Sequence, residues 1–216
     1  HEAGILVAEL LADHRAQAVF WLGLVDRYTL DGNADADTAL ARLQHAAAAA
    51  KLARDRILEL RIANRRAEIL LGAGEIDGAV RCSKEAMEIL DIEGAQDHYV
   101  CHVIGTRLRC LSLAGQLAEA RRLHDQAKPL AARVSVLQRQ AYVSGIAYLA
   151  VLGNEPERAI PETRVALEQL RAAGITRMLI NPLHNLGDLL LRSGDFEGAA
   201  ECFREALRFA GLHGFV

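Results

Sequence analysis

Two amphipathic runs separated by one sharp break fill the stretch from Ile180 to Phe209. In each run the apolar residues recur at spacings of three and four, which predicts two amphipathic helices. The break is Ser193-Gly194-Asp195, and a turn this short requires the two helices to pack antiparallel. We expect Asp195 to be the N-cap of the second helix. The apolar positions are Leu183, Leu186, Leu190 and Leu191, then Phe196, Ala199, Ala200, Phe203, Ala206, Leu207 and Phe209.

The same arrangement recurs along the whole chain. An alanine follows each turn, and successive alanines are 40, 41, 39 and 40 residues apart (Ala39, Ala79, Ala120, Ala159 and Ala199). A fixed period of this length predicts a helical solenoid. We therefore expect an all-α fold, with residues 1–216 forming a single solenoid of about five antiparallel helix pairs and residues 1–12 ending an earlier second helix. The predicted pairs are 14–52, 56–90, 96–132, 134–172 and 176–210, with turns near 32–36, 73–75, 114–116, 153–155 and 193–195.

The last pair resembles a tetratricopeptide repeat (TPR). The residues that carry the resemblance are Leu183, Leu186-Gly187, Leu190, Gly194-Asp195, Ala199, Phe203 and Ala206. The resemblance implies a right-handed superhelix in which the first helix of each pair lines a concave groove. The period here exceeds the roughly 34 residues of a standard tetratricopeptide repeat, so we expect longer helices or loops.

A second resemblance concerns the units of about forty residues and the end of the chain. Residues 206–210 followed by Gly214-Phe215-Val216 are similar to the end of the repeat region in large ATP-dependent LuxR-type transcription regulators, the MalT-like group. The resemblance implies a fragment of a bacterial regulator whose repeats sense an inducer or a partner protein. The chain contains no GxxxxGK[ST] motif, so the ATPase of such a regulator is not expected in it.

Composition narrows the class of protein. Hydrophobic residues make up 51% of the chain and the net charge is -3, which excludes a disordered chain. No apolar run reaches the roughly 18 residues that a membrane helix needs. The four cysteines form no CxxC pair, which favours reduced thiols in a cytosol. We therefore predict a cytoplasmic protein that does not bind membranes. The acidic net charge and the lack of a dense basic stripe argue against direct binding of nucleic acid.

Two motifs were considered as metal sites. Residues 31–37, DGNADAD, resemble half of a calcium loop, but Ala36 and Arg42 stand where such a loop needs Gly and Glu. We interpret the segment as a long turn that ends in an Asp37 N-cap. His98, Cys101 and His102 share about a turn and a half of helix without a further ligand motif, and surface histidines explain them better. We predict no metal, no cofactor and no catalytic residues, since no catalytic motif is present.

Charge on the first helices points to a binding surface. These helices and their starts carry eleven arginines and six acids, although the whole chain is acidic. Arginine offers a planar fork for carboxylates. We therefore predict a scaffold that binds a protein or peptide, most readily an acidic one. A small-molecule inducer is the alternative ligand, and an enzyme is the third hypothesis. We also expect self-association through exposed ends of the solenoid.

The repeat phase places particular residues in the concave groove. Amide and guanidinium groups there suit a peptide backbone and its carboxylates. The predicted ligand-binding residues are Arg61, Asn64, Arg65, His102, Arg109, Tyr148, Asn181, His184 and Asn185.

Overall fold

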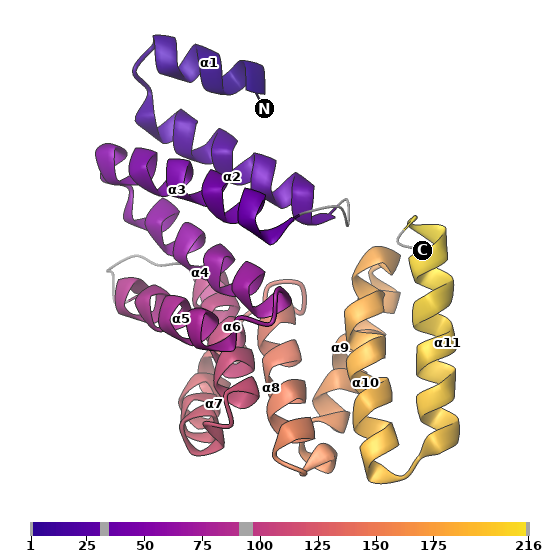
Figure 1. Cartoon of the computed structure of the whole chain (residues 1–216). Coiled ribbons are helices and arrows are strands. Elements are labelled where there is room, and N and C mark those ends of the chain that lie inside the picture. Colours follow the sequence, from indigo (N-terminus) through magenta and orange to yellow (C-terminus); the bar gives the residue numbers. More distant parts are fainter. Residues whose placement is uncertain (1, 31–34, 91–96, 215–216) are drawn as a thin grey trace. The chain divides into compact units, whose positions relative to one another are not determined.

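The computed structural model describes residues 2–30, 35–90 and 97–214, and the chain divides into two compact units, residues 1–95 and 96–216. Every regular element in the described ranges is a helix (Figure 1), which confirms the all-α repeat fold.

The first unit consists of one leading helix and two antiparallel pairs. The helices are α1 (Glu2–Leu10), α2 (His14–Leu30), α3 (Ala36–Ala53), α4 (Arg56–Gly72) and α5 (Ile76–Leu90). Aliphatic residues on α2, α3 and α4 form its core, including Leu22, Leu43 and Ile62, each less than 5% exposed. Burial of these apolar faces stabilises the helices more than their intrinsic propensity does.

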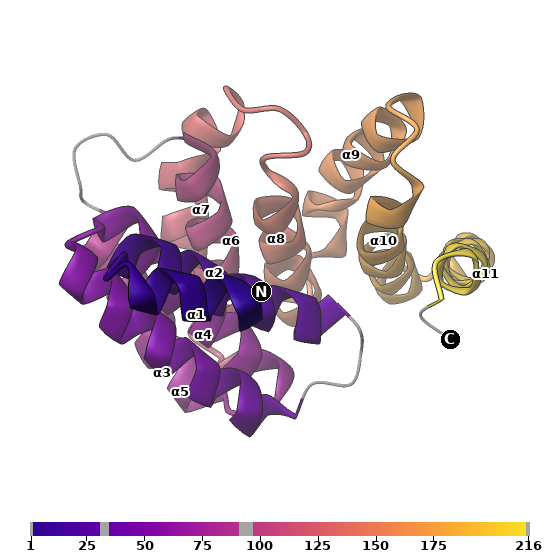
Figure 2. The same cartoon turned by 90° about the horizontal axis from the view of Figure 1, so that it is seen from above.

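The second unit contains the remaining three pairs. Its elements are α6 (Asp97–Leu113), α7 (Leu117–Ala131), α8 (Gln140–Leu152), η1 (Pro156–Arg158), α9 (Ile160–Ala172), η2 (Thr176–Leu179), α10 (Ile180–Ser193) and α11 (Phe196–Leu212). The first helices of these pairs pack directly on one another: α8 contacts both α6 and α10. Figure 2 shows α11 lying beside α10, its antiparallel partner.

The turns predicted at 73–75, 114–116, 153–155 and 193–195 are confirmed, while most of the turn near 32–36 lies outside the described residues. Gly194 shows why such turns are sharp: its φ of 89° is left-handed, a conformation that glycine adopts without steric cost. Asp195 caps α11 as predicted, because its carboxylate accepts the backbone N–H of Gly198 at 2.9 Å.

Two local predictions differ from the structure. The helix expected to start at Val134 begins at Gln140, because residues 132–139 form turns. The N-cap of α3 is Asp35 rather than Asp37, and it accepts the N–H groups of Asp37 and Thr38. A short 3₁₀ turn starting at Pro156 precedes α9, and Pro161 lies in the first turn of that helix. Proline lacks the N–H that a helix interior requires, so both prolines fit these terminal positions.

The five alanines that set the period are all buried, none more than 2% exposed (Ala39, Ala79, Ala120, Ala159 and Ala199). Gly187 plays a related part, since a Cβ there would lie 2.5 Å from the Phe203 ring of α11. Small residues therefore occur where paired helices meet, as the repeat phase predicted.

Two first helices of the second unit, rather than the two helices of a pair, approach each other very closely. A Cβ on Gly105 of α6 would lie 2.2 Å from the backbone of Ala141 on α8. A Cβ on Gly145 would lie 2.7 Å from the Gly105 carbonyl oxygen. The two helices thus touch backbone to backbone, which only glycine permits.

Candidate functional site

A row of polar side chains crosses the three first helices of the second unit. It consists of Arg109 on α6, Ser144 and Tyr148 on α8, and Asn185 on α10, and we call it the polar row. Ser144 and Tyr148 are four residues apart and so share one face of α8. Three of the four residues were expected in the ligand-binding groove, and Ser144 belongs to the same predicted face.

Arg109 and Tyr148 contact each other directly. The Arg109 guanidinium carbon lies 5.4 Å from the centre of the Tyr148 ring, a cation–π geometry. Both side chains are half-buried, and Arg109 makes no ion pair with any residue that the structure describes. Its Nε is buried and has no hydrogen-bond acceptor in that part of the chain. The charge of Arg109 is therefore held in place without being neutralised by a carboxylate of the described residues.

The other end of the polar row is fixed by a hydrogen bond. Asn185, only 8% exposed, donates from Nδ2 to the Ser144 hydroxyl at 3.3 Å. His184 is exposed, and its ring meets the Phe203 ring of α11 edge-on. Its Nδ1 lies 3.6 Å from the carboxylate of Asp188, which is on the same helix as His184. Asn181 and His102 are also exposed. Of the predicted residues in this unit, Arg109, Tyr148 and Asn185 are brought together by contacts through α8.

The remaining three predicted residues lie on α4 in the first unit. Asn64 is 3% exposed and donates to Glu68 on the same helix at 3.4 Å, so little of its side chain is open to a ligand in this structure. Arg65 is bound to Asp26 on α2 and to Glu68, the latter at 2.9 Å. Arg61 is half-buried and makes no ion pair with a described residue. Arg65 is one of the arginines in excess on the first helices, and its positive charge is already paired with two carboxylates of the chain.

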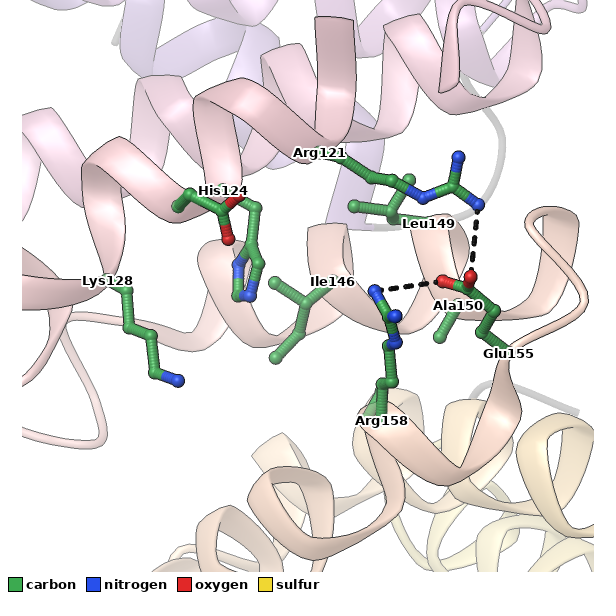
Figure 3. Close-up of a pocket in the computed structure, with 10 residues that line it drawn as sticks. Arg121, His124, Lys128, Ile146, Leu149, Ala150, Glu155 and Arg158 are labelled. Carbon is green, nitrogen blue, oxygen red and sulfur yellow. Dashed lines mark ion pairs between the residues drawn. The ribbon is translucent and has the colours of Figure 1, made fainter. Parts of the chain in front are cut away.

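Sequence analysis missed a cavity of about 280 Å³ between α7, α8 and η1 (Figure 3). Ile146, Leu149 and Ala150 provide its apolar wall. The Glu155 carboxylate at its edge forms ion pairs with the guanidinium groups of Arg121, at 3.4 Å, and Arg158, at 3.2 Å. The other lining residues are His124, Asp125, Lys128 and Ala159. One signal in the sequence marks this cavity: Arg121, His124 and Lys128 recur at helical spacing on α7.

His124 in this cavity is held by a buried tyrosine. The Tyr142 hydroxyl lies 2.8 Å from His124 Nδ1, and the two rings stack at 5.8 Å. Burial raises the pKa of Tyr142 well above its ordinary value, so the phenol stays protonated. Burial also lowers the pKa of His124, which favours the neutral ring. A protonated phenol can donate to Nδ1, and in that arrangement the proton of the neutral imidazole sits on Nε2.

We predict that acid selectively weakens the folded state through His124. A histidine pKa that is lower in the folded than in the unfolded chain stabilises the protein above pH 6.5, its ordinary value. That stability is lost as the pH falls through the folded pKa. The parent should therefore lose more unfolding free energy between pH 7 and pH 5 than His124→Gln, measured by urea denaturation. The charged and titratable neighbours are common to both proteins: Asp125, Lys128, Tyr142, Arg158 and Glu162.

Parallel pH profiles for the two proteins would contradict this assignment. Gln is a suitable replacement because its amide oxygen accepts the Tyr142 hydroxyl but does not titrate.

The residues that the structure describes contain no grouping of three or more His, Cys, Asp or Glu side chains arranged as metal ligands. The side chain of His98 and residues 31–34 of the calcium-like segment lie outside the described residues. The four cysteines, all of which lie in the described residues, form no disulfide. Within residues 2–30, 35–90 and 97–214, no helix combines the length and apolar character needed to cross a bilayer.

Known proteins resemble this chain in its repeats and its fold. The family model for the tetratricopeptide repeat matches residues 181–212, the stretch that holds α10 and α11. Among curated proteins, none matches the chain in sequence.

Several solved structures share the fold. BtubC (BKLC) from P. vanneervenii is 18% identical with a TM-score of 0.68, and the alignment covers 99% of this chain and 89% of that one. A Q17M variant of a putative kinesin light chain from Podosopora anserina, with nearly identical TPR-like repeats, is 16% identical. Its TM-score is 0.59, covering 97% of this chain and 98% of that one. Residues 181–212 are therefore a tetratricopeptide repeat within a chain that has the fold of TPR-like helical repeat proteins.

Proposed function

We propose that the chain is a non-catalytic scaffold that binds a protein or peptide through the polar row. One observation carries the proposal: Arg109 presents a guanidinium that no carboxylate of the described chain neutralises, fixed over the Tyr148 ring. Arginine and tyrosine are the residue types that dominate binding energy at protein interfaces. Asn185 and Ser144, which are hydrogen-bonded to each other, add polar groups suited to a peptide backbone.

The preferred partner in this proposal is an acidic segment. A guanidinium binds a carboxylate through two parallel hydrogen bonds, and its planar face can remain stacked on an aromatic ring. Among the predicted ligand-binding arginines, Arg61 on α4 of the first unit also makes no ion pair with a described residue. Arg65 already binds two carboxylates, so its contribution to a ligand is smaller than that of Arg109.

The test is titration of acidic and basic peptide libraries against the parent and Arg109→Ala. Acidic peptides should bind more tightly than basic ones, and more weakly as salt is added, because exposed charges are screened over about 10 Å at 0.1 M. Loss of Arg109 should weaken acidic-peptide binding about fivefold, since one partly exposed ion pair contributes at most about 1 kcal/mol. An Arg61→Ala, Arg65→Ala, Arg109→Ala triple variant should bind more weakly still.

The control is Arg192→Ala, which removes the same charge from an exposed position at the end of α10. Equal binding of both libraries by the parent would refute the preference for an acidic partner. A loss of affinity as large in Arg192→Ala as in Arg109→Ala would mean that net charge, rather than the polar row, drives binding.

We also propose a biological setting: the sensor or interaction region of a cytoplasmic bacterial transcription regulator of the MalT-like LuxR group. The period near 40 residues and the residues 206–216 support it. In that setting a small-molecule inducer is the alternative ligand. The full-length gene provides the check: the proposal requires an upstream P-loop ATPase and a downstream helix-turn-helix, and other neighbouring domains would refute it.

Self-association is a further part of the proposal. Large apolar side chains are exposed on α1, such as Leu10 at 86%, and on α11, such as Phe196 at 69% and Leu207 at 63%. Exposed apolar surface of this kind favours association. We expect the mass measured by light scattering to rise with concentration, and to rise less in Leu10→Glu and Leu207→Glu variants. A constant monomer mass at all concentrations would contradict this expectation.

A further inference from the structure

The cavity between α7 and α8 lies where the second helix of the third pair departs from the sequence pattern of the other second helices. The buried alanine that sets the period serves as a reference point in each pair. Four positions are compared relative to it: three residues before the alanine, and one, four and eight residues after it. In four of the five pairs these positions are apolar or small. They are Ala36, Leu40, Leu43 and Ala47; Ile76, Val80, Ser83 and Met87; Pro156, Ile160, Thr163 and Leu167; Phe196, Ala200, Phe203 and Leu207.

The third pair breaks this rule at three of its four positions. Its residues are Leu117, Arg121, His124 and Lys128. In the first and fourth pairs, Leu43 and Leu167 at these positions are 2% exposed and belong to the apolar cores. On α7, basic side chains take these places and line the cavity instead (Figure 3). Arg121 and His124 are partly buried and Lys128 is exposed, so these polar groups stay accessible to an anion that enters the cavity from solvent.

The charges around the cavity favour an anion. The three cations that line it are Arg121, Lys128 and Arg158. Glu155 forms ion pairs with Arg121 and Arg158 and so neutralises part of their combined charge. Lys128 makes no ion pair with a described residue, and Asp125 is the only other carboxylate among the lining residues. In Figure 3 the His124 ring points into the space beside Ile146, between Lys128 and Arg158. When the Tyr142 hydroxyl donates to His124 Nδ1, the ring carries its N–H on Nε2, which is then a donor there.

The cavity is separate from the polar row. Ile146 and Ala150 lie two positions along α8 from Ser144 and Tyr148, respectively. Two residues correspond to about 200° of rotation around an α-helix, so the two sets occupy opposite faces. Binding in the cavity can therefore be tested without disturbing the proposed peptide surface.

We propose that this cavity binds a small organic anion. Its carboxylate or phosphate group lies between Lys128, His124 and Arg158, and a short apolar part covers Ile146, Leu149 and Ala150. The volume of about 280 Å³ lies just below the range of about 300–1,000 Å³ typical of ligand pockets, so the ligand is compact. The anion supplies the acceptors that this stripe of α7 lacks, and the apolar wall selects against fully hydrated inorganic ions.

The experiment titrates the chain with isovalerate, phenyl phosphate, inorganic phosphate and the neutral isovaleramide, following the His124 ring by NMR. Isovalerate or phenyl phosphate should shift the His124 resonances saturably, inorganic phosphate more weakly, and isovaleramide not at all. Which organic anion binds more tightly distinguishes a carboxylate site from a phosphate site. Lys128→Gln and Arg158→Gln should each weaken binding about tenfold, the loss expected for one charge-assisted hydrogen bond.

Two matched variants keep the test specific. Arg122→Gln removes a charge from an exposed neighbouring position on α7 that does not line the cavity, and should leave binding unchanged. Arg109→Ala should also leave it unchanged, which separates this site from the polar row. Equal weakening by Arg122→Gln, or no saturable shift with either organic anion, would overturn the proposal. So would a His124 shift produced by acidic peptides but by neither organic anion.

Discussion

Replacing Gly105 by alanine is expected to lower the free energy of unfolding by about 3 kcal/mol, the upper part of the usual range for overpacking. The added methyl group would lie 2.2 Å from the backbone of Ala141, and a backbone cannot move aside as a flexible side chain does. The gain of about 1 kcal/mol in helix propensity that alanine brings offsets only part of this cost. For a chain of this size the thermal midpoint should fall by about 6–12 °C.

Gly72→Ala is the control for Gly105→Ala. Gly72 is the last residue of α4, and a Cβ there meets nothing within 4 Å. This variant should be neutral or slightly stabilised in the same calorimetric scan. If both variants melted with the parent, the close approach of α6 and α8 would be wrong.

A second large loss of stability is expected from Leu183→Ala. Leu183 is 1% exposed and belongs to the core formed by α9, α10 and α11. Truncating a leucine in a packed core removes its burial and leaves a cavity, at a cost of about 2–5 kcal/mol. Urea denaturation should show a lower midpoint with an unchanged slope.

Leu191→Ala on the same helix is the matched control. Leu191 is 47% exposed, so its truncation should change the unfolding free energy by about 0.5 kcal/mol or less. Similar losses for the two leucines would show that the apolar face of α10 has been assigned to the wrong residues.

The helix pairs were predictable because residues close to each turn determine where the helices end. Glycine or asparagine with a positive φ lies in four of the predicted turns, as at Gly74 and Asn154. Each turn is followed within five residues by a buried alanine, so spacing alone set the register. The start of α8 was missed because the sequence from residue 132 to 139 holds neither glycine nor proline. Its turns depend on local hydrogen bonds, such as those joining Ser135 and Gln138.

The candidate sites were less predictable, because they depend on contacts between helices. A helical pattern identified the first-helix face but did not reveal that Arg65 is bound to Asp26, 39 residues earlier. It also did not distinguish the buried Asn64 from the exposed Asn181. The α7 cavity was missed for a related reason: the basic stripe becomes visible only when the second helices are aligned with one another.

The glycine contact between α6 and α8 has a consequence for molecular recognition. Arg109 lies four residues after Gly105, and Tyr148 lies three residues after Gly145, so both are about one turn beyond the contact. Two backbones in contact leave no layer of side chains through which the helices can slide or rotate. A partner that binds Arg109 and Tyr148 therefore meets groups whose separation is set before it arrives. Less conformational entropy is lost on binding to a preorganised surface, and more of the contact energy appears as affinity.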